Sequence, residues 1–338
     1  MARPRLFPRF SVRSVDLGRC LDTFLVVAVA SVLGNRIFLI ITGYPQLGNG
    51  TLHISHAIWG ALMMAIAIIS AVTFLGPATR SFVAFLGGAG FGWFIDELGK
   101  FITRDVNYFF EPTFALMYIT FVTMYLVFRS LERRRYGPDE GLLNGLEALK
   151  SAALGQLREP QRREAIALFD RTGPTGPIAD QVRVLLDDAP ALPPRPPSWP
   201  ARVAAAVRSR YLSLAGLRWF PTAINSLFVV FAVIEVTGVV ELGRDGRGIV
   251  TFAEWVTVVS SVAVAVNLGI GVVVLPRSRV AAYRWFDRGL LVHLYVVQIF
   301  VFAEKQLAGA ISLVVTLAVW VLLRSAMRAE RDEAALAA

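Results

Sequence analysis

The sequence predicts an all-α membrane protein: a polytopic bundle of about eight transmembrane helices in two halves of four, with a small cytoplasmic helical insertion between them. Three observations predict this fold. The chain has 338 residues, of which 55% are hydrophobic and only 17% charged, and its mean hydropathy is +0.57; soluble domains carry more charge. Its apolar residues come in runs of about 18 residues or more, the length of a membrane-spanning helix. Its arginines gather in short segments that flank these runs.

Apolar runs bounded by turn and charge signals predict the positions of the spans. In the first half of the chain, the predicted spans are 21–42, 53–75, 82–103 and 112–128. In the second half, they are 219–240, 249–275, 289–303 and 307–323. The last two are short and nearly continuous, as in a hairpin. The basic segment before residue 21 is similar to the start of a signal peptide, but the apolar run after it is too long for a cleaved signal. We therefore expect a retained first helix.

The arginines also predict which ends of the spans face the cytoplasm. They cluster before the first predicted span, after the second and the fourth, between the sixth and the seventh, and after the last. The connections on the other side are short and much less basic. Lys and Arg are retained on the cytoplasmic side of a membrane, so we expect both termini and the long segment between the halves to be cytoplasmic. The pattern accounts for the net charge of +9, and we expect no nucleic-acid partner.

These predictions divide the chain into five parts. They are a basic cytoplasmic N-terminus (1–20), a first four-span half (21–130), a cytoplasmic insertion (131–218), a second four-span half (219–324) and a cytoplasmic C-terminal tail (325–338). The single cysteine, Cys20, lies at the edge of the first apolar run. One cysteine excludes an internal disulfide and any multi-cysteine metal site, and we expect Cys20 to serve packing.

The insertion 131–218 has the patterns of a small helical unit. LLNGLEALKSAALGQL and REAIALFDRTG have apolar residues at helical spacing, and the second ends in Gly, a usual helix stop. GPIADQVRVLLDD predicts a third short helix with Pro177 near its start. APALPPRPPSWP predicts a proline-rich linker, and ARVAAAVRSRYLSLAG predicts a basic amphipathic helix on the inner membrane surface. We expect this unit to pack against the bundle and to dock a cytoplasmic protein partner.

Ionisable side chains inside the apolar runs predict a polar cluster in the outer leaflet. Each costs about 3 kcal/mol at membrane depth, so such groups persist when they are paired or face a cavity. Arg36 lies roughly 9 Å and Asp96 roughly 10 Å from the outer ends of their spans, which predicts a pair between helices. Lys100 is three and four residues from Glu97 and Asp96, within reach on one helix. The predicted ligand- and ion-binding residues are Arg36, Asp96, Glu97, Lys100, Glu235, Glu254 and Glu304.

Two of the three histidines could either bind a metal or make ordinary hydrogen bonds. His53 and His56 lie three residues apart, so they can hold one divalent metal from a single helix turn, with Asp96 or Glu97 as a third ligand. Ordinary hydrogen bonding near the interface is the other alternative, and the sequence leaves both open. His293 lies near the inner end of its predicted span, which disfavours a three-histidine zinc site and a bis-histidine haem. The cofactor stays unknown.

The segment GFGWFIDELGKFITRDVNYFFEP, preceded by HISHAIWGALMM, is similar to a family of bacterial multi-pass membrane proteins without an assigned activity. The resemblance covers the first four predicted spans and, weakly, FAEKQLAG. It implies that the acid-and-lysine segment is a hallmark of the family and that the chain lies in a bacterial plasma membrane. It implies nothing about a substrate.

Three functions stay open. The first is an integral membrane protein that binds or transports a small solute or ion through the outer polar cluster, which we place first by analogy of fold class. The second is an intramembrane enzyme, with or without a metal, that acts on a lipid or lipid-linked substrate. The third is a membrane scaffold or sensor whose insertion meets a protein partner. We expect the lipid bilayer as a partner in all three.

Overall fold

The computed structural model describes residues 12–42, 56–97, 113–197 and 252–336, with isolated positions between 201 and 237. In these ranges the chain is helical and forms no strand. Five of the described helices are long and apolar enough to cross a membrane, and Gly309–Arg324 is a shorter apolar helix. The prediction of an all-α protein with several helices that could span a membrane is therefore confirmed, whereas the number eight stays a prediction.

Four of the predicted spans correspond closely to single helices. They are α1 (Leu17–Thr42), α2 (His56–Thr73), α5 (Thr113–Glu132) and α11 (Phe252–Val274). The span predicted at 82–103 begins earlier, because α3 (Pro77–Asp96) starts at Pro77 directly after Gly76. Proline at the first helical position suits the backbone there, since its missing N–H would have no partner within the helix. The span predicted at 219–240 lies almost entirely outside the described residues.

The short span predicted at 289–303 needs a correction. The structure has one apolar helix from Arg279 to Lys305, made of α12 (Arg279–Val292), the π-helical turn η1 (His293–Val297) and α13 (Gln298–Lys305). Its charged first turns look like a loop in sequence, but Asp287 accepts hydrogen bonds from Trp320 and Arg324 of α14 (Gly309–Leu336). Asp287 thus joins α12 to α14. Helix α14 also runs through most of the tail predicted at 325–338.

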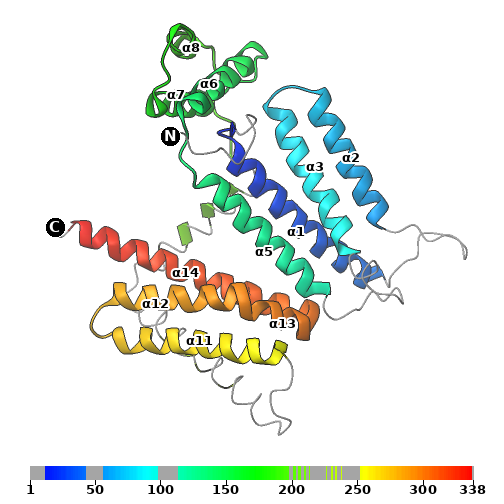
Figure 1. Cartoon of the computed structure of the whole chain (residues 1–338), viewed down its shortest axis with the longest axis vertical. Helices are drawn as coiled ribbons and strands as arrows, with labels where there is room; N and C mark the ends of the chain where they lie inside the picture. Colours follow the sequence, from blue (N-terminus) through cyan, green and yellow to red (C-terminus); the bar gives the residue numbers. More distant parts are fainter. Residues whose placement is uncertain are drawn as a thin grey trace, which may run out of the picture. The chain divides into compact units, whose positions relative to one another are not determined.

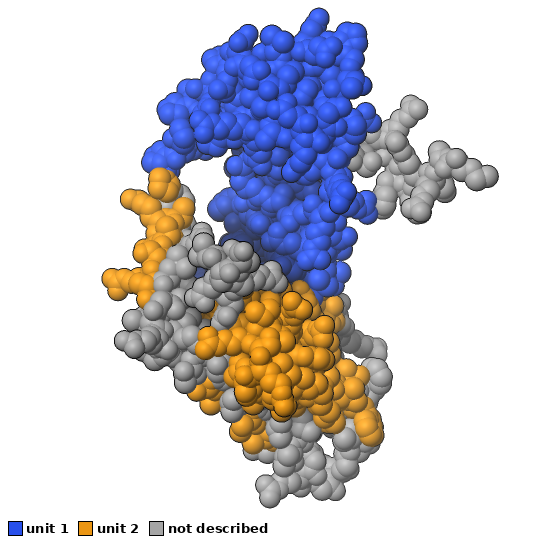
Figure 2. All heavy atoms as spheres, turned by 90° about the vertical axis from the view of Figure 1, so that its left-hand side faces the viewer, with its two compact units in different colours: residues 1–108, 120–196 blue, residues 109–119, 197–338 orange. Residues whose placement is uncertain are grey.

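The chain forms two compact units (Figure 2). In the first unit, α3 packs against both α1 and α2 (Figure 1). Glycines make this packing close: a Cβ on Gly90 would lie 2.6 Å from the carbonyl oxygen of Gly60, and one on Gly88 would lie 2.5 Å from that of Phe24. The backbones of these helices therefore touch directly, as small residues allow between membrane helices.

The first unit also holds the predicted helices of the insertion. They are α6 (Pro138–Ala153), α7 (Glu159–Thr172) and α8 (Pro177–Asp188), which bury a shared apolar core around Leu157, Phe169 and Leu186. Helix α7 ends at Gly173, whose φ of 58° is left-handed, as expected for a glycine stop. We call α6, α7 and α8 the three-helix unit.

The three-helix unit binds the segment that leads into α1. The amide of Val15 donates to Asn144 of α6 at 2.7 Å, and the Asn144 side chain donates to the carbonyl of Arg13 at 2.8 Å. Arg13 forms an ion pair with Glu140 at 2.8 Å. Arg80 of α3 pairs with Glu147 of α6 at 3.0 Å. Side chains of α6 thus hold the beginnings of two apolar helices.

The second unit contains α11 to α14, together with the first turns of α5 up to Ile119. Its core gathers Leu268 of α11, Phe286 and Leu290 of α12, and Leu323 of α14. The predicted hairpin between its last two helices is present, since a short 3₁₀ turn, η2 (Gln306–Ala308), joins α13 to α14. The buried side chain of Gln298 crosses this hairpin, donating to the carbonyl of Gly309 at 2.9 Å.

Candidate functional site

The candidate site lies at the C-terminal end of α3, where three helices of the first unit meet. Asp96 is the last residue of α3 and Glu97 follows it as the C-cap. Helix α1 contributes Asn35 and Arg36, and α2 contributes its first residue, His56. The structure thus brings together five polar side chains from separate predicted spans. We call them the polar cluster.

Arg36 and Asp96 form a buried ion pair, as their predicted depths suggested. Arg36 Nε donates to Asp96 Oδ1 at 2.6 Å, and the two side chains are only 7% and 4% exposed. A second guanidinium nitrogen donates to the backbone carbonyl of Asp96 at 3.0 Å. The last carbonyls of a helix have no partner within it and carry partial negative charge. Arg36 therefore compensates both the carboxylate and the end of α3.

Asn35 completes this pair and was missed by the sequence analysis. Its Nδ2 donates to the second carboxylate oxygen of Asp96 at 2.6 Å. Each oxygen of the buried carboxylate thus has its own donor, which is the condition for burying a charge in an apolar setting. A signal was present, because an amide beside an arginine within an apolar run is itself expensive to bury without a partner. The arrangement ties α1 to α3.

Glu97 and His56 form the other half of the cluster. Glu97 Oε1 lies 3.1 Å from His56 Nδ1, with side-chain exposures of 2% and 15%. The imidazole also lies nearly perpendicular to the ring of Trp93, one turn before Glu97 on α3, with ring centroids 6.1 Å apart. The tautomer of the imidazole decides whether Nδ1 donates or accepts in this contact. The contact joins the start of α2 to the end of α3.

The remaining predicted site residues are not part of this arrangement in the described part of the chain. Lys100, His53 and Glu235 lie outside the described residues, and so does the side chain of Glu254. Glu304 is exposed near the end of α13, in the second unit. Because His53 belongs to the predicted metal set, that set stays a prediction. Within the described residues, no group of three or more His, Cys, Asp or Glu could hold a metal ion.

Comparison with protein-family models, with curated proteins and with solved structures gave no match to this chain. The resemblance of the segment around Asp96 to bacterial multi-pass membrane proteins thus stays a prediction from the sequence.

Proposed function

We propose that the chain is a multi-pass protein of a bacterial plasma membrane that binds and moves a small ion through the polar cluster, and that this ion is a proton. Five helices long and apolar enough to cross a membrane support the location. The arginine pattern supports the orientation, with both termini and the three-helix unit in the cytoplasm. In this proposal the cluster faces the outer side of the membrane.

The observation that carries the proposal is the His56–Glu97 pair. A carboxylate that is 2% exposed lies 3.1 Å from an imidazole, at the end of an apolar helix. Ionisable groups at membrane depth are expensive and mark ion paths and proton relays. A carboxylate and an imidazole in contact can share one proton and pass it on, and the pair then carries one negative charge until another proton arrives. The pair has the chemistry of a proton carrier.

Arg36, Asp96 and Asn35 have a different role in this proposal. Their donors and acceptors are matched within the protein. Releasing this pair to bind a solute would leave a buried charge uncompensated, at a cost of about 3–5 kcal/mol. We propose that these three residues position the end of α3, and that they thereby hold Glu97 beside His56.

Proton movement into liposomes tests the proposal. The full chain is reconstituted into liposomes that contain a trapped pH-sensitive dye. The outside medium is then made more acidic than the inside, so that protons are driven inward. We expect the wild type to dissipate the gradient, Glu97→Gln to abolish this at unchanged reconstitution yield, and Glu164→Gln to leave it intact, because Glu164 is an exposed carboxylate of the three-helix unit. No proton movement by the wild type, or full movement by Glu97→Gln, would contradict the proposal.

A metal-dependent enzyme is the second candidate, and the contact between His56 and Glu97 favours it, since both side chains are common metal ligands. Elemental analysis of the purified protein beside a His53→Ala, His56→Ala double variant decides this question. A near-stoichiometric transition metal in the wild type that is lost in the double variant supports an intramembrane enzyme acting on a lipid-like substrate. Equal metal content in both samples removes these histidines as ligands.

The three-helix unit could also bind a protein partner, whether the chain moves protons or acts as an enzyme. It has its own core, and it holds the entry into α1 and the start of α3 through specific side chains. A cytoplasmic protein bound to it would therefore act on the first turns of two apolar helices. Crosslinking of the intact chain in cells, compared with a chain carrying Arg183→Gln and Asp170→Asn on its exposed α7–α8 surface, tests for such a partner.

A further inference from the structure

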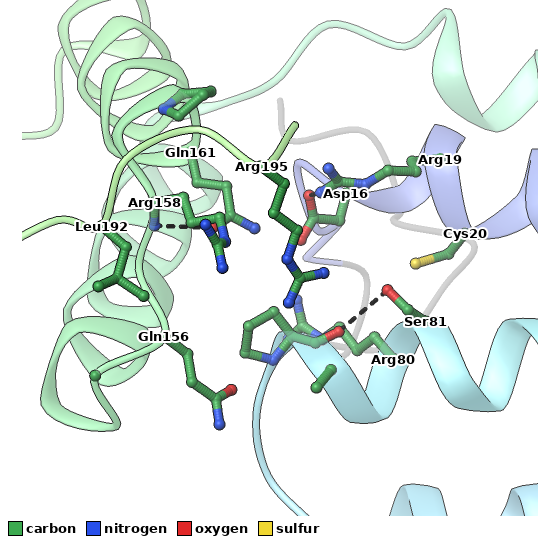
Figure 3. Close-up of a pocket in the computed structure, with 14 residues that line it drawn as sticks. Asp16, Arg19, Cys20, Arg80, Ser81, Gln156, Arg158, Gln161, Leu192 and Arg195 are labelled. Atoms are coloured by element: carbon green, nitrogen blue, oxygen red, sulfur yellow. Dashed lines mark hydrogen bonds and ion pairs between the residues drawn. The ribbon is translucent and has the colours of Figure 1, made fainter. Parts of the chain in front are cut away.

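A cavity of about 640 Å³ lies inside the first unit, away from the polar cluster (Figure 3). Its walls come from four parts of the chain that are distant in sequence: the start of α1, the start of α3, the start of α7 with the turn before it, and the proline-rich segment after α8. The volume is in the range of pockets that hold small molecules.

The cavity is strongly basic. Four arginines line it and Asp16 is its single acidic lining residue. The arginines are Arg19, Arg80, Arg158 and Arg195. Figure 3 shows the side chain of Arg195 reaching from the proline-rich segment into the space between Asp16 and Arg80. Guanidinium groups that face one space repel each other unless an anion lies between them.

The carboxylates of the described chain do not balance this charge. Arg19 pairs with Asp16, and Arg80 pairs with Glu147. Arg158 donates instead to a neutral acceptor, the carbonyl of Pro193, at 2.7 Å. Arg195 is exposed and has no hydrogen bond or ion pair to any described residue. Two positive charges thus face the cavity without a carboxylate partner among the described residues.

The backbone adds positive potential to the same space. Ala78, in the first turn of α3, lines the cavity, and so does Asp16 directly before α1. The first amides of a helix have no acceptor within the helix and carry partial positive charge. Helix α3 begins after Gly76, which has no side chain to accept from these amides. Guanidinium groups and first-turn amides together are the donors that bind phosphate groups in proteins.

We propose that this cavity binds a phosphate-bearing anion, with Arg158 and Arg195 as the side chains that contact the phosphate. The ligand bridges the start of α7 and the proline-rich segment to the starts of α1 and α3, so its binding stabilises the first unit. The walls formed by α1 and α3 lie at the ends of apolar helices, where lipid headgroups gather in a membrane. The phosphate therefore comes either from an anionic lipid or from a soluble phosphate compound.

Thermal unfolding of the full chain in neutral detergent tests the proposal, with two probes at constant ionic strength. The soluble probe is inorganic pyrophosphate, compared with chloride. The lipid probe is phosphatidylglycerol in mixed micelles, compared with phosphatidylcholine. We expect one of the two probes to raise the unfolding temperature of the wild type. A shift with pyrophosphate identifies a soluble ligand, and a shift with phosphatidylglycerol alone identifies a lipid headgroup.

Matched variants show whether the shift comes from the cavity. Arg195→Gln removes a side chain without partners in the described chain, so the variant should fold, and it should bind the probe about tenfold more weakly or worse. Arg158→Gln together with Arg195→Gln should abolish the shift. The control, Arg163→Gln with Arg171→Gln, removes the same charge from exposed positions of α7 outside the cavity. No shift with either probe in the wild type, or equal shifts in the double variant and the control, would overturn the proposal.

Discussion

Asp96 shows how one carboxylate is held inside an apolar helix. Its two oxygens accept from Arg36 and Asn35 at 2.6 Å each, and its own backbone carbonyl accepts from the same guanidinium. The residue is buried, so these donors replace the water that an exposed carboxylate would bind. The three residues form one unit, in which removing any member leaves another without its partner.

Arg36→Met is expected to lower the free energy of unfolding by about 3–5 kcal/mol, because it leaves the charge of Asp96 buried and uncompensated. The double variant Arg36→Met, Asp96→Leu is expected to recover most of this loss, since both charges are then absent. Unfolding in detergent, followed by intrinsic fluorescence, measures both. If the loss in the double variant equals the sum of the losses in Arg36→Met and Asp96→Leu alone, the two residues do not act as a pair.

Among the helices, close backbone packing decides which positions can carry a side chain. Gly60 of α2 and Gly90 of α3 face each other so closely that a Cβ on either would lie 2.6 Å from the other's carbonyl oxygen. Backbone cannot move aside as a flexible side chain can. Gly34 of α1 has no atom within 4 Å of the position that its Cβ would take. The two kinds of glycine look alike in sequence.

Gly90→Ala is expected to destabilise the protein by about 1–3 kcal/mol, because the new methyl group would force α2 and α3 apart. Gly34→Ala is the matched control, and it is expected to be neutral or stabilising by up to about 1 kcal/mol, since alanine favours the helix more than glycine does. Thermal unfolding in the same detergent compares them. Equal effects of the two substitutions would show that α2 and α3 do not approach this closely at Gly90.

On a larger scale, Glu140 helps to hold the three-helix unit against the segment that leads into α1, through its ion pair with Arg13. Burial raises the pKa of Glu140, but hydrogen bonds from Arg13 and from the amide of Gly137 outweigh it, so the pKa lies below its ordinary value of 4.5. The hydrogen bond to Glu140 in turn raises the pKa of Arg13, which burial opposes. The ionised carboxylate is therefore the form that binds Arg13 and stabilises the docked state.

The pH dependence follows from the lowered pKa. The stabilisation by Glu140 is fully present above 4.5, the ordinary pKa of the group in the unfolded chain, and is lost as the pH falls through the lower pKa of the folded state. The difference in unfolding temperature between the wild type and Glu140→Gln should be constant from about pH 6 to pH 8 and should vanish in acid. Glu164→Gln, at an exposed position of α7, should show no such difference. A difference that persists in acid would exclude the charge of Glu140 as its source.

The sequence alone determined the helices whose signals are local. Apolar runs of sufficient length predicted α1, α2, α5 and α11, and prolines and glycines predicted where α7 ends and α8 begins. Helical rise even predicted that Arg36 meets Asp96, because both lie at similar depths in neighbouring spans. Such inferences succeed because run length, turn residues and rise per residue are properties of the chain itself.

Only the tertiary structure decided which side chains meet across helices. Asp287 of α12 meets Trp320 and Arg324 of α14 only when the two helices pack. Asn35 donates a hydrogen bond to Asp96 only because the packing of α1 on α3 turns this face of α1 toward Asp96. The basic cavity gathers residues from 16 to 195, which no spacing pattern connects. The physical reason is the same in each case. The partner of a side chain and the walls of a cavity depend on which faces of the helices pack together. Close contact between glycines fixes this packing only when the helices are assembled.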